Sequence, residues 1–288
     1  MATIVDVINH AAALFTAAGI PNARLDAEVL LCHTLERDRA WLLAHIRDGL
    51  GDEQRMIFEQ AVERRASREP LQYIIGRQEF WGLEFLVTPD VLIPRPETEL
   101  IIETVLGSVP DRNRPLTVID LCTGSGCIAV SLAKELPAAR VFASDTSEKA
   151  LVVARENARR HGVEDRIRFF EGDLFGPLEE LDIRGQIDII VSNPPYIASG
   201  DRPALQPEVR DYEPAMALFA GPDGMELHRR IVVTAPLFLK CNGELVMEMG
   251  IGQAEALTRM IRETGLYDTP AVLKDLAGIE RVIEARKK

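Results

Sequence analysis

The sequence predicts an α/β protein in which a doubly wound, Rossmann-like sheet domain follows a small N-terminal all-helical domain. Over residues 1–75, apolar side chains recur at helical spacing and no strand pattern appears among them. From residue 94 onward, short β-rich apolar runs alternate with helical stretches, as in parallel sheets. A chain of 288 residues is also longer than one domain of about 100–200 residues, so two domains are expected.

The helical domain is expected to cover residues 1–75. Ile4, Ile8, Ala11 and Phe15 mark one face of a first helix, which ends before Gly19. A second helix passes through residues 27–31, and a long charged helix covers about residues 52–68.

Residues 76–93 are predicted to form a hairpin linker. Gly76 and Gly82 punctuate alternating apolar and aromatic positions, which is typical of two short strands joined by a turn. A helix is then expected to begin near Thr98, with the Thr98 side chain as its N-cap and Glu99 in its first turn.

Residues 94–288 are expected to form the doubly wound domain. Its strands are predicted at residues 117–121, 140–143, 167–170, 187–191 and 244–249. Two further runs, 271–273 and 281–283, lie on either side of Gly278 and are expected to pair as antiparallel strands.

Composition narrows the classes of function. The chain has 45 acidic and 33 basic residues and a formal net charge of −12, which disfavours stable binding to nucleic acid. The sequence shows no secretory signal and no apolar run of the ~20 residues that span a bilayer, so we expect a cytoplasmic protein without membrane association. The 4 cysteines show neither disulfide nor zinc spacing, and no metal site is predicted.

A glycine-rich turn follows the first predicted strand, at the sheet edge where open α/β folds bind ligands. The residues expected to contact a nucleotide-like cofactor there are Cys122, Thr123, Gly124, Ser125 and Gly126. Asp145 ends the second strand, where its carboxylate is suited to ribose hydroxyls. Asp120 either orders the glycine turn or meets an ammonium group of the cofactor. The turn alone does not distinguish NAD from S-adenosylmethionine.

Asp173 and Leu174 follow the third strand of the sheet. They are expected either to contact an adenine ring or, in the case of Asp173, to cap the next helical turn.

The segment with the strongest chemical signal is Asn193-Pro194-Pro195-Tyr196, directly after a buried strand. The Asn193 side-chain oxygen and the Pro194 carbonyl are acceptors for both hydrogens of a planar NH2 group, and the Tyr196 ring is suited to stack on its flat face. Acceptors placed this way stabilise the positive charge that develops when the nitrogen attacks a methyl sulfonium. We therefore expect Asn193, Pro194 and Tyr196 to be catalytic, with Pro195 also in the substrate site.

The chain resembles the release-factor glutamine methyltransferases over nearly its whole length. The segments that carry this resemblance are PLQYIIG from Pro70, EFWGLEF from Glu79, VLIPRPETE from Val91, NPPY from Asn193, PEVRDYEP from Pro207, GPDG from Gly221 and KDLAG from Lys274. The resemblance implies a class I methyltransferase domain that transfers a methyl group from S-adenosylmethionine to the N5 amide of the glutamine in the Gly-Gly-Gln motif of class 1 peptide chain release factors. It also implies that the helical domain grips the release factor.

The same resemblance assigns residues to the site. It implies that Asn193 to Tyr196 bind the glutamine, and that the glycine turn, Asp145, Leu174 and Asn193 line the cofactor site. Residues 94–99 would close over the cofactor, although a proline-started helix fits them equally well. Cys122 departs from the glycine that is more common in the family.

Other functions compete with this interpretation. An adenine methyltransferase acting on nucleic acid would use the same acceptors for an exocyclic NH2 group, but the acidic balance and the lack of a target-reading domain disfavour it. A non-catalytic relic of a cofactor-binding module, or an NAD oxidoreductase, would leave the NPPY segment without a role. We expect a monomer.

Overall fold

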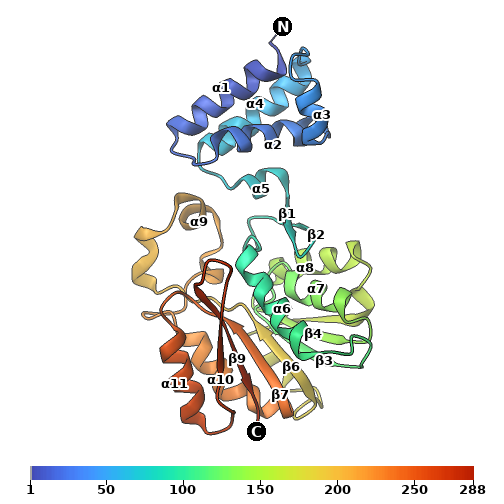
Figure 1. Ribbon diagram of the computed structural model, residues 1–288, viewed down its shortest axis with the longest axis vertical. Coiled ribbons are helices and arrows are strands. Elements are labelled where there is room, and N and C mark those ends of the chain that lie inside the picture. The colour runs from blue at the N-terminus through green and yellow to red at the C-terminus, as the bar shows by residue number, and fades with distance from the viewer. Residues whose placement is uncertain (1) are drawn as a thin grey trace. The chain divides into compact units, whose positions relative to one another are not determined.

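The computed structural model describes residues 2–288, which form two compact units (Figure 1). The helical unit contains the described residues up to Arg77 together with Gln206–Tyr212. The sheet unit contains Gln78–Leu205 and Glu213–Lys288. Among residues 2–288, every helix is too short or too polar to cross a membrane.

The helical unit is a bundle around one apolar core. Its helices are α1 (Ile4–Ala17), α2 (Ala23–Leu35), α3 (Arg39–Ala44), α4 (Asp52–Ala66), α5 (Leu71–Ile75) and α9 (Pro207–Tyr212). Thr3 caps α1 through a capping box, in which Asp6 N donates to Thr3 Oγ1 and Thr3 N donates to Asp6 Oδ2. Ile8 and Phe15, from the predicted face of the first helix, are fully buried. The three predicted helices are confirmed, and α3 and α5 are additional short ones.

A return segment, Gln206–Tyr212, belongs to this unit although the whole of Gln78–Leu205 separates it from the rest of the unit in the sequence. Glu208 accepts hydrogen bonds from Arg65 at 3.2 Å and from Arg68 at 2.6 Å, and Tyr212 OH donates to the Ser67 carbonyl at 2.6 Å. The sequence patterns placed these residues within 94–288 and gave no sign of this return.

A two-stranded hairpin is present within residues 76–93, and from Gln78 onward these residues belong to the sheet unit. It consists of β1 (Arg77–Phe80) and β2 (Leu83–Leu86). Trp81 and Gly82 join them with φ of 54° and 67°, and two successive positive φ values give the turn twist that two-residue hairpins favour.

The sheet unit holds a seven-stranded sheet in the order β5-β4-β3-β6-β7-β9-β8. Its strands are β3 (Thr117–Leu121), β4 (Arg140–Asp145), β5 (Ile167–Glu171), β6 (Ile187–Ser192), β7 (Leu239–Glu248), β8 (Ala271–Lys274) and β9 (Glu280–Arg286). The pairs from β5 through β7 are parallel, while β9 pairs antiparallel with both β7 and β8. Each predicted strand is present, and the terminal antiparallel pair is confirmed.

Helices cover both faces of this sheet, as the doubly wound class predicts. The helices are α6 (Glu99–Ser108), α7 (Cys127–Glu135), α8 (Glu148–Arg160), α10 (Glu226–Phe238) and α11 (Ala254–Thr264). Short 3-10 turns lie at η1 (Pro96–Thr98), η2 (Glu164–Arg166), η3 (Gly176–Leu178), η4 (Ser199–Ala204) and η5 (Ala215–Ala217).

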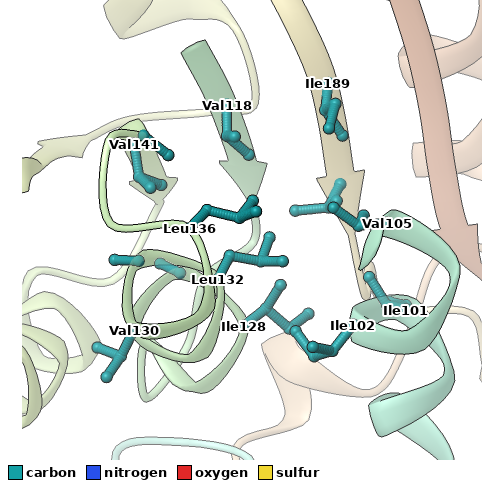
Figure 2. Packing of buried hydrophobic residues seen from close by; sticks show 14 of the residues in the cluster. Ile101, Ile102, Val105, Val118, Ile128, Val130, Leu132, Leu136, Val141 and Ile189 are labelled. Carbon is teal, nitrogen blue, oxygen red and sulfur yellow. The ribbon is translucent and has the colours of Figure 1, made fainter. Parts of the chain in front are cut away.

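The two apolar cores explain why the strands are apolar on both sides. Figure 2 shows Val105 of α6 and Leu132 of α7 packed toward Val118 and Ile189 on one face, and all four are at most 3% exposed. Residues of α10 and α11 pack on the opposite face, around Ile190. Burying each large apolar side chain contributes roughly 1.5–3 kcal/mol, so both faces hold the strands in place.

The strand order also places the functional edge. The chain runs from β3 outward through β4 and β5, and then returns to β6 on the other side of β3. Ligands of open α/β sheets bind at such a reversal, beyond the carboxyl ends of the strands.

Candidate active site

A cavity of about 170 Å³ lies at this edge, within the sheet unit. Its lining comes from the turn at residues 90–92, the loop after β3, residues 144–147 at the end of β4, residues 172–174 after β5, Asn193 and Pro195 after β6, and residues 214–217. Motifs that are far apart in the sequence therefore meet in one pocket.

The glycine turn after β3 adopts the left-handed conformations that its residues suggested. Gly124 and Gly126 have φ of 55° and 79°, and Cys122 has φ of 59°. A Cβ at Gly126 would lie 3.0 Å from the Ala154 Cβ, so this glycine lets α7 start close to α8. Cys122 carries the backbone strain that a non-glycine residue has at positive φ.

Hydrogen bonds from backbone N–H groups hold the Asp145 carboxylate beside this turn. Gly124 N donates to Oδ2 and Ser147 N donates to Oδ1, each at 2.9 Å. Burial raises the pKa of the Asp145 carboxyl above its ordinary value, although these N–H groups oppose the shift. The carboxylate lines the cavity, where its remaining acceptor capacity faces a ligand.

Asp120 lies behind the turn and does not line the cavity. It is fully buried and accepts a hydrogen bond from Thr123 Oγ1 at 2.5 Å, while its Oδ1 has no partner among the described residues. Burial raises the pKa of the Asp120 carboxyl to about 7. Of the two roles expected for Asp120, the geometry supports ordering of the turn.

Leu174 and Asp173 both line the cavity, in different ways. Leu174 is 4% exposed and has φ of 48°, and its carbonyl accepts a hydrogen bond from Ser144 Oγ at 2.9 Å. The Asp173 side chain pairs with Arg230, and η3 has no side-chain cap. The expectation that Asp173 caps the next turn is therefore wrong, because its carboxylate is engaged by the guanidinium.

The Asn193–Tyr196 segment is joined to a buried carboxylate that the sequence did not point to. Asn193 Nδ2 donates to Thr98 Oγ1 at 3.1 Å, and Thr98 Oγ1 donates to Glu248 Oε2 at 2.6 Å. Tyr196 OH donates to the second oxygen, Glu248 Oε1, at 3.1 Å. Glu248 is 2% exposed, and burial raises the pKa of its carboxyl to about 7.

This network corrects the prediction that Thr98 caps α6. Thr98 already has helical backbone angles at the end of η1, and its side chain makes no cap hydrogen bond. The hydroxyl points to Glu248 instead.

The Tyr196 backbone is held as firmly as its ring. Gln253 Nε2 donates to the Tyr196 carbonyl at 3.0 Å. A Cβ at Gly224 would lie 2.2 Å from the same carbonyl oxygen, and a Cβ at Gly250 would lie 3.0 Å from Tyr196 Cδ2. Only glycine fits at Gly224, because the carbonyl occupies the space that a side chain would need.

The structure brings some predicted residues to the cavity and leaves others behind it. Those that line it are Cys122, Gly124, Asp145, Asp173, Leu174, Asn193 and Pro195. Those that do not are Thr123, Ser125, Gly126, Pro194 and Tyr196. The cavity wall also includes Asp90, Met216 and Ala217, which no sequence pattern singled out, and Val91 and Leu92, which begin the VLIPRPETE segment but had no expected role in the site.

Residues 94–99 do not line the cavity, but two of them support it. Thr98 contacts Asn193, and Arg95 pairs at 2.5 Å with Glu213, next to the cavity-lining Pro214. The residues preceding this segment, 90–92, are the ones that form the wall. Pro96 opens η1, so the proline-started helical turn is present.

Across residues 2–288, no group of three or more His, Cys, Asp or Glu side chains is arranged to hold a metal ion. Cys32, Cys122, Cys127 and Cys241 are free thiols. Burial raises the pKa of Cys127 to about 12, which makes it an inert core residue.

Comparisons with known proteins agree over the whole chain. Residues 6–76 match the family described as PrmC N-terminal domain, and residues 98–206 match the methyltransferase small domain. The release factor glutamine methyltransferase of Geobacter sulfurreducens is 46% identical over 99% of this chain and 96% of its own length. The enzyme of the same name from Moorella thermoacetica is 41% identical over 99% of both chains.

A solved structure supports the fold. The hMettl16 catalytic domain, in complex with MAT2A 3′UTR hairpin 6, aligns with a TM-score of 0.56 over 81% of each chain. At 18% identity, this likeness shows the methyltransferase fold alone.

Proposed function

Because this chain belongs to the release factor glutamine methyltransferase family, we propose that it methylates the Gly-Gly-Gln glutamine of class 1 peptide chain release factors at the side-chain nitrogen, with S-adenosylmethionine as donor. Family membership makes it a protein-glutamine methyltransferase. The donor, the motif and the roles of individual residues are the parts proposed. The observation that carries them is the position of Asn193 beside Asp145 and the glycine turn in one cavity.

The residues of the cavity fit S-adenosylmethionine. The Asp145 carboxylate lines the cavity and is held in place by backbone N–H groups of Gly124 and Ser147, which suits it to accept hydrogen bonds from ribose hydroxyls. Gly124 lets the ligand approach the backbone closely, and Leu174 offers an apolar surface to the adenine. We assign Cys122, Thr123, Ser125, Gly126 and Asp173 to the same site, of which Cys122 and Asp173 line the cavity and the other three shape the turn. When bound, S-adenosylmethionine supplies an electrophilic methyl group.

The substrate amide is assigned to the NPPY segment. Asn193 Oδ1 and the Pro194 carbonyl accept the two hydrogens of the glutamine NH2 group, and the Tyr196 ring stacks on the amide plane. Neither acceptor receives a hydrogen bond from another described residue, so both are available. Pro195 stiffens the segment by fixing its φ.

These acceptors compensate for the weak nucleophilicity of an amide. The nitrogen becomes positive as its new bond to the methyl carbon forms and the carbon–sulfur bond of the donor breaks, with a neutral thioether as the leaving group. The nitrogen then releases one proton to solvent, which restores a neutral amide. Preorganised acceptors are worth most where that charge develops, and orientation of the reacting atoms lowers the barrier further.

We assign recognition of the release factor to the helical unit, whose residues 6–76 match the PrmC N-terminal domain. A protein substrate is consistent with the acidic balance of the chain, 45 against 33 charged residues, which opposes stable contact with nucleic acid. A monomeric enzyme located in the cytoplasm, where translation ends, completes the proposal.

The test is transfer of radiolabelled methyl from S-adenosylmethionine to a purified release factor. The controls are the same factor with alanine in place of the Gly-Gly-Gln glutamine, and adenine-rich DNA. Label on the intact factor alone supports the proposal, whereas label on DNA alone would replace it with an adenine methyltransferase. Asn193→Ala should abolish transfer and leave the cofactor Kd nearly unchanged, and Tyr196→Phe should retain more activity than Tyr196→Ala.

A further inference from the structure

A directional chain of hydrogen bonds ends at the amide of Asn193. The carboxylate of Glu248 receives the Thr98 hydroxyl at 2.6 Å, and Thr98 Oγ1 receives Asn193 Nδ2 at 3.1 Å. The strand register explains this proximity, because Ser192 of β6 pairs with Met247 of β7 and the next residue of each strand follows at the sheet edge.

The charge of Glu248 determines the direction of this chain. An ionised carboxylate only accepts hydrogen bonds, and a threonine hydroxyl has a single hydrogen to donate. Thr98 must therefore donate to Glu248, which leaves its oxygen as an acceptor. Asn193 can then form a hydrogen bond with Thr98 Oγ1 only by donating from its side-chain NH2 group. The Asn193 Oδ1 atom is therefore turned away from Thr98.

The same carboxylate also holds the second substrate-contacting side chain. Tyr196 OH donates to the other oxygen of Glu248 at 3.1 Å. Both Thr98 and Glu248 are at most 2% exposed, so water does not offer alternative partners to this network.

We infer that Glu248 and Thr98 are positioning residues, which lock the Asn193 amide in the orientation that presents Oδ1, rather than NH2, to the substrate nitrogen. This inference rests on the proposed function. The oxygen end and the NH2 end of a side-chain amide are nearly equal in size, so the amide is free to flip without the hydrogen bond to Thr98. The flipped form directs N–H donors at the NH2 group of the substrate. The wrong orientation repels the amide that has to be methylated.

The decisive substitution is Thr98→Val, which keeps the shape and removes the relay. We expect kcat to fall roughly 10²-fold, the size of effect seen when one preorganised polar contact to a reacting group is lost. The Kd for S-adenosylmethionine should stay within about twofold, since Asp145 and the glycine turn are untouched. Thr98→Ser restores the hydroxyl and should recover kcat to within about threefold of the wild-type value.

Two controls separate positioning from general damage. Thr104→Val removes another buried threonine hydroxyl, which donates to the Leu100 carbonyl and has no link to Asn193. It should leave kcat unchanged at a similar Tm. Glu248→Leu should lower kcat at least as much as Thr98→Val does, because it also removes the acceptor of Tyr196 OH. Assays at pH 8.5 keep Glu248 ionised, because burial raises the pKa of its carboxyl only to about 7.

An NMR measurement in the absence of substrate tests the orientation of the Asn193 amide independently of methyl transfer. In protein labelled with ¹⁵N-asparagine, the side-chain NH2 signal of Asn193 should shift in Thr98→Val and stay in place in Thr98→Ser and Thr104→Val. Unchanged kcat and an unchanged Asn193 signal in Thr98→Val would overturn the positioning role. Failure of the wild-type enzyme to label the release factor would instead overturn the proposed function, while the Asn193 signal would still report the lock.

Discussion

Gly224 should be the glycine whose replacement damages the site most, because its missing side chain leaves room for the Tyr196 carbonyl. With alanine there, the Cβ would lie 2.2 Å from that oxygen and 3.1 Å from Ala198 N. Carbon and oxygen cannot approach so closely, so the NPPY backbone has to move. The hydrogen bond from Gln253 Nε2 to the Tyr196 carbonyl, 3.0 Å long, would move or break with it.

Two separate costs add up in Gly224→Ala. The backbone has φ of 71°, and a left-handed conformation costs a residue with a Cβ about 1–2 kcal/mol. Overpacking against the Tyr196 carbonyl costs about 1–3 kcal/mol more. Gly265→Ala is the matched control, because Gly265 has φ of 69° and nothing lies within 4 Å of its would-be Cβ.

Urea unfolding and methyl transfer to a release factor measure both consequences. Gly265→Ala should lose only the backbone contribution, about 1–2 kcal/mol, and keep its kcat. Gly224→Ala should lose about 1–3 kcal/mol more and at least tenfold in kcat, because the acceptors move away from near-attack geometry. Equal losses of stability in the two variants, with wild-type kcat in both, would refute the reasoning.

Two further substitutions test local strain and buried charge. Cys122→Gly should be about 1 kcal/mol more stable than Cys122→Ala in urea unfolding, because φ of 59° strains any residue with a Cβ; a less stable glycine variant would contradict this. Arg65→Ala should lower the free energy of unfolding by about 3–5 kcal/mol, because Arg65 is buried between Asp26, at 2.8 Å, and Glu208, at 3.2 Å. Arg259→Ala is the control, because the pair of Arg259 with Glu255 is exposed on both sides and should contribute about 1 kcal/mol or less. A similarly small loss in Arg65→Ala would show that its pairs are weak.

Local patterns in the sequence were sufficient to predict most of the fold. Strand β3 has the predicted bounds, and β7 begins five residues before its prediction at Leu239. Periodicity and turn residues are local properties, so they identify elements well. The insertion of β9 between β7 and β8 depends on long-range pairing, which no local pattern encodes.

The same distinction applies to the site. The glycine turn, Asp145 and NPPY each stand as a short motif at a strand end, so sequence reasoning could propose all three as parts of the site. Glu248 reaches Thr98 across 150 residues, and Thr98 reaches Asn193 across 95. The sequence did contain an indication of the role of Glu248, because a glutamate within a buried apolar strand needs polar partners in the fold.

Glu208 shows a further limit of sequence reasoning. Glu208 lies in the PEVRDYEP segment, but that segment carries no sign of the partners of its carboxylate, which are two arginines from α4 and its C-terminal turn. Its role depends on which basic residues the fold places opposite it, and that information lies 140 residues earlier in the chain.

Stability should fall as the pH rises through the range in which Glu248 titrates. Burial raises the pKa of this carboxyl from 4.5 to about 7, so the folded protein keeps a proton that the unfolded chain releases between those pH values. The free energy of unfolding therefore decreases across this window, by up to roughly 3 kcal/mol for this group. Below pH 4.5 both states are protonated, so stability no longer depends on pH through this group and is at its full value.

Glu248→Gln isolates this contribution, because the amide does not titrate and all other groups are shared. Urea unfolding of wild type and variant at pH 5 and pH 8 should give a smaller loss of stability in the variant, by up to roughly 3 kcal/mol. Equal losses in the two proteins would show that the pKa of Glu248 is not raised. A larger loss in the wild type means that a carboxylate is kept at a position where it destabilises the fold at neutral pH. Such a cost is the expected signature of a residue that positions Thr98 and Asn193 rather than one that stabilises the fold.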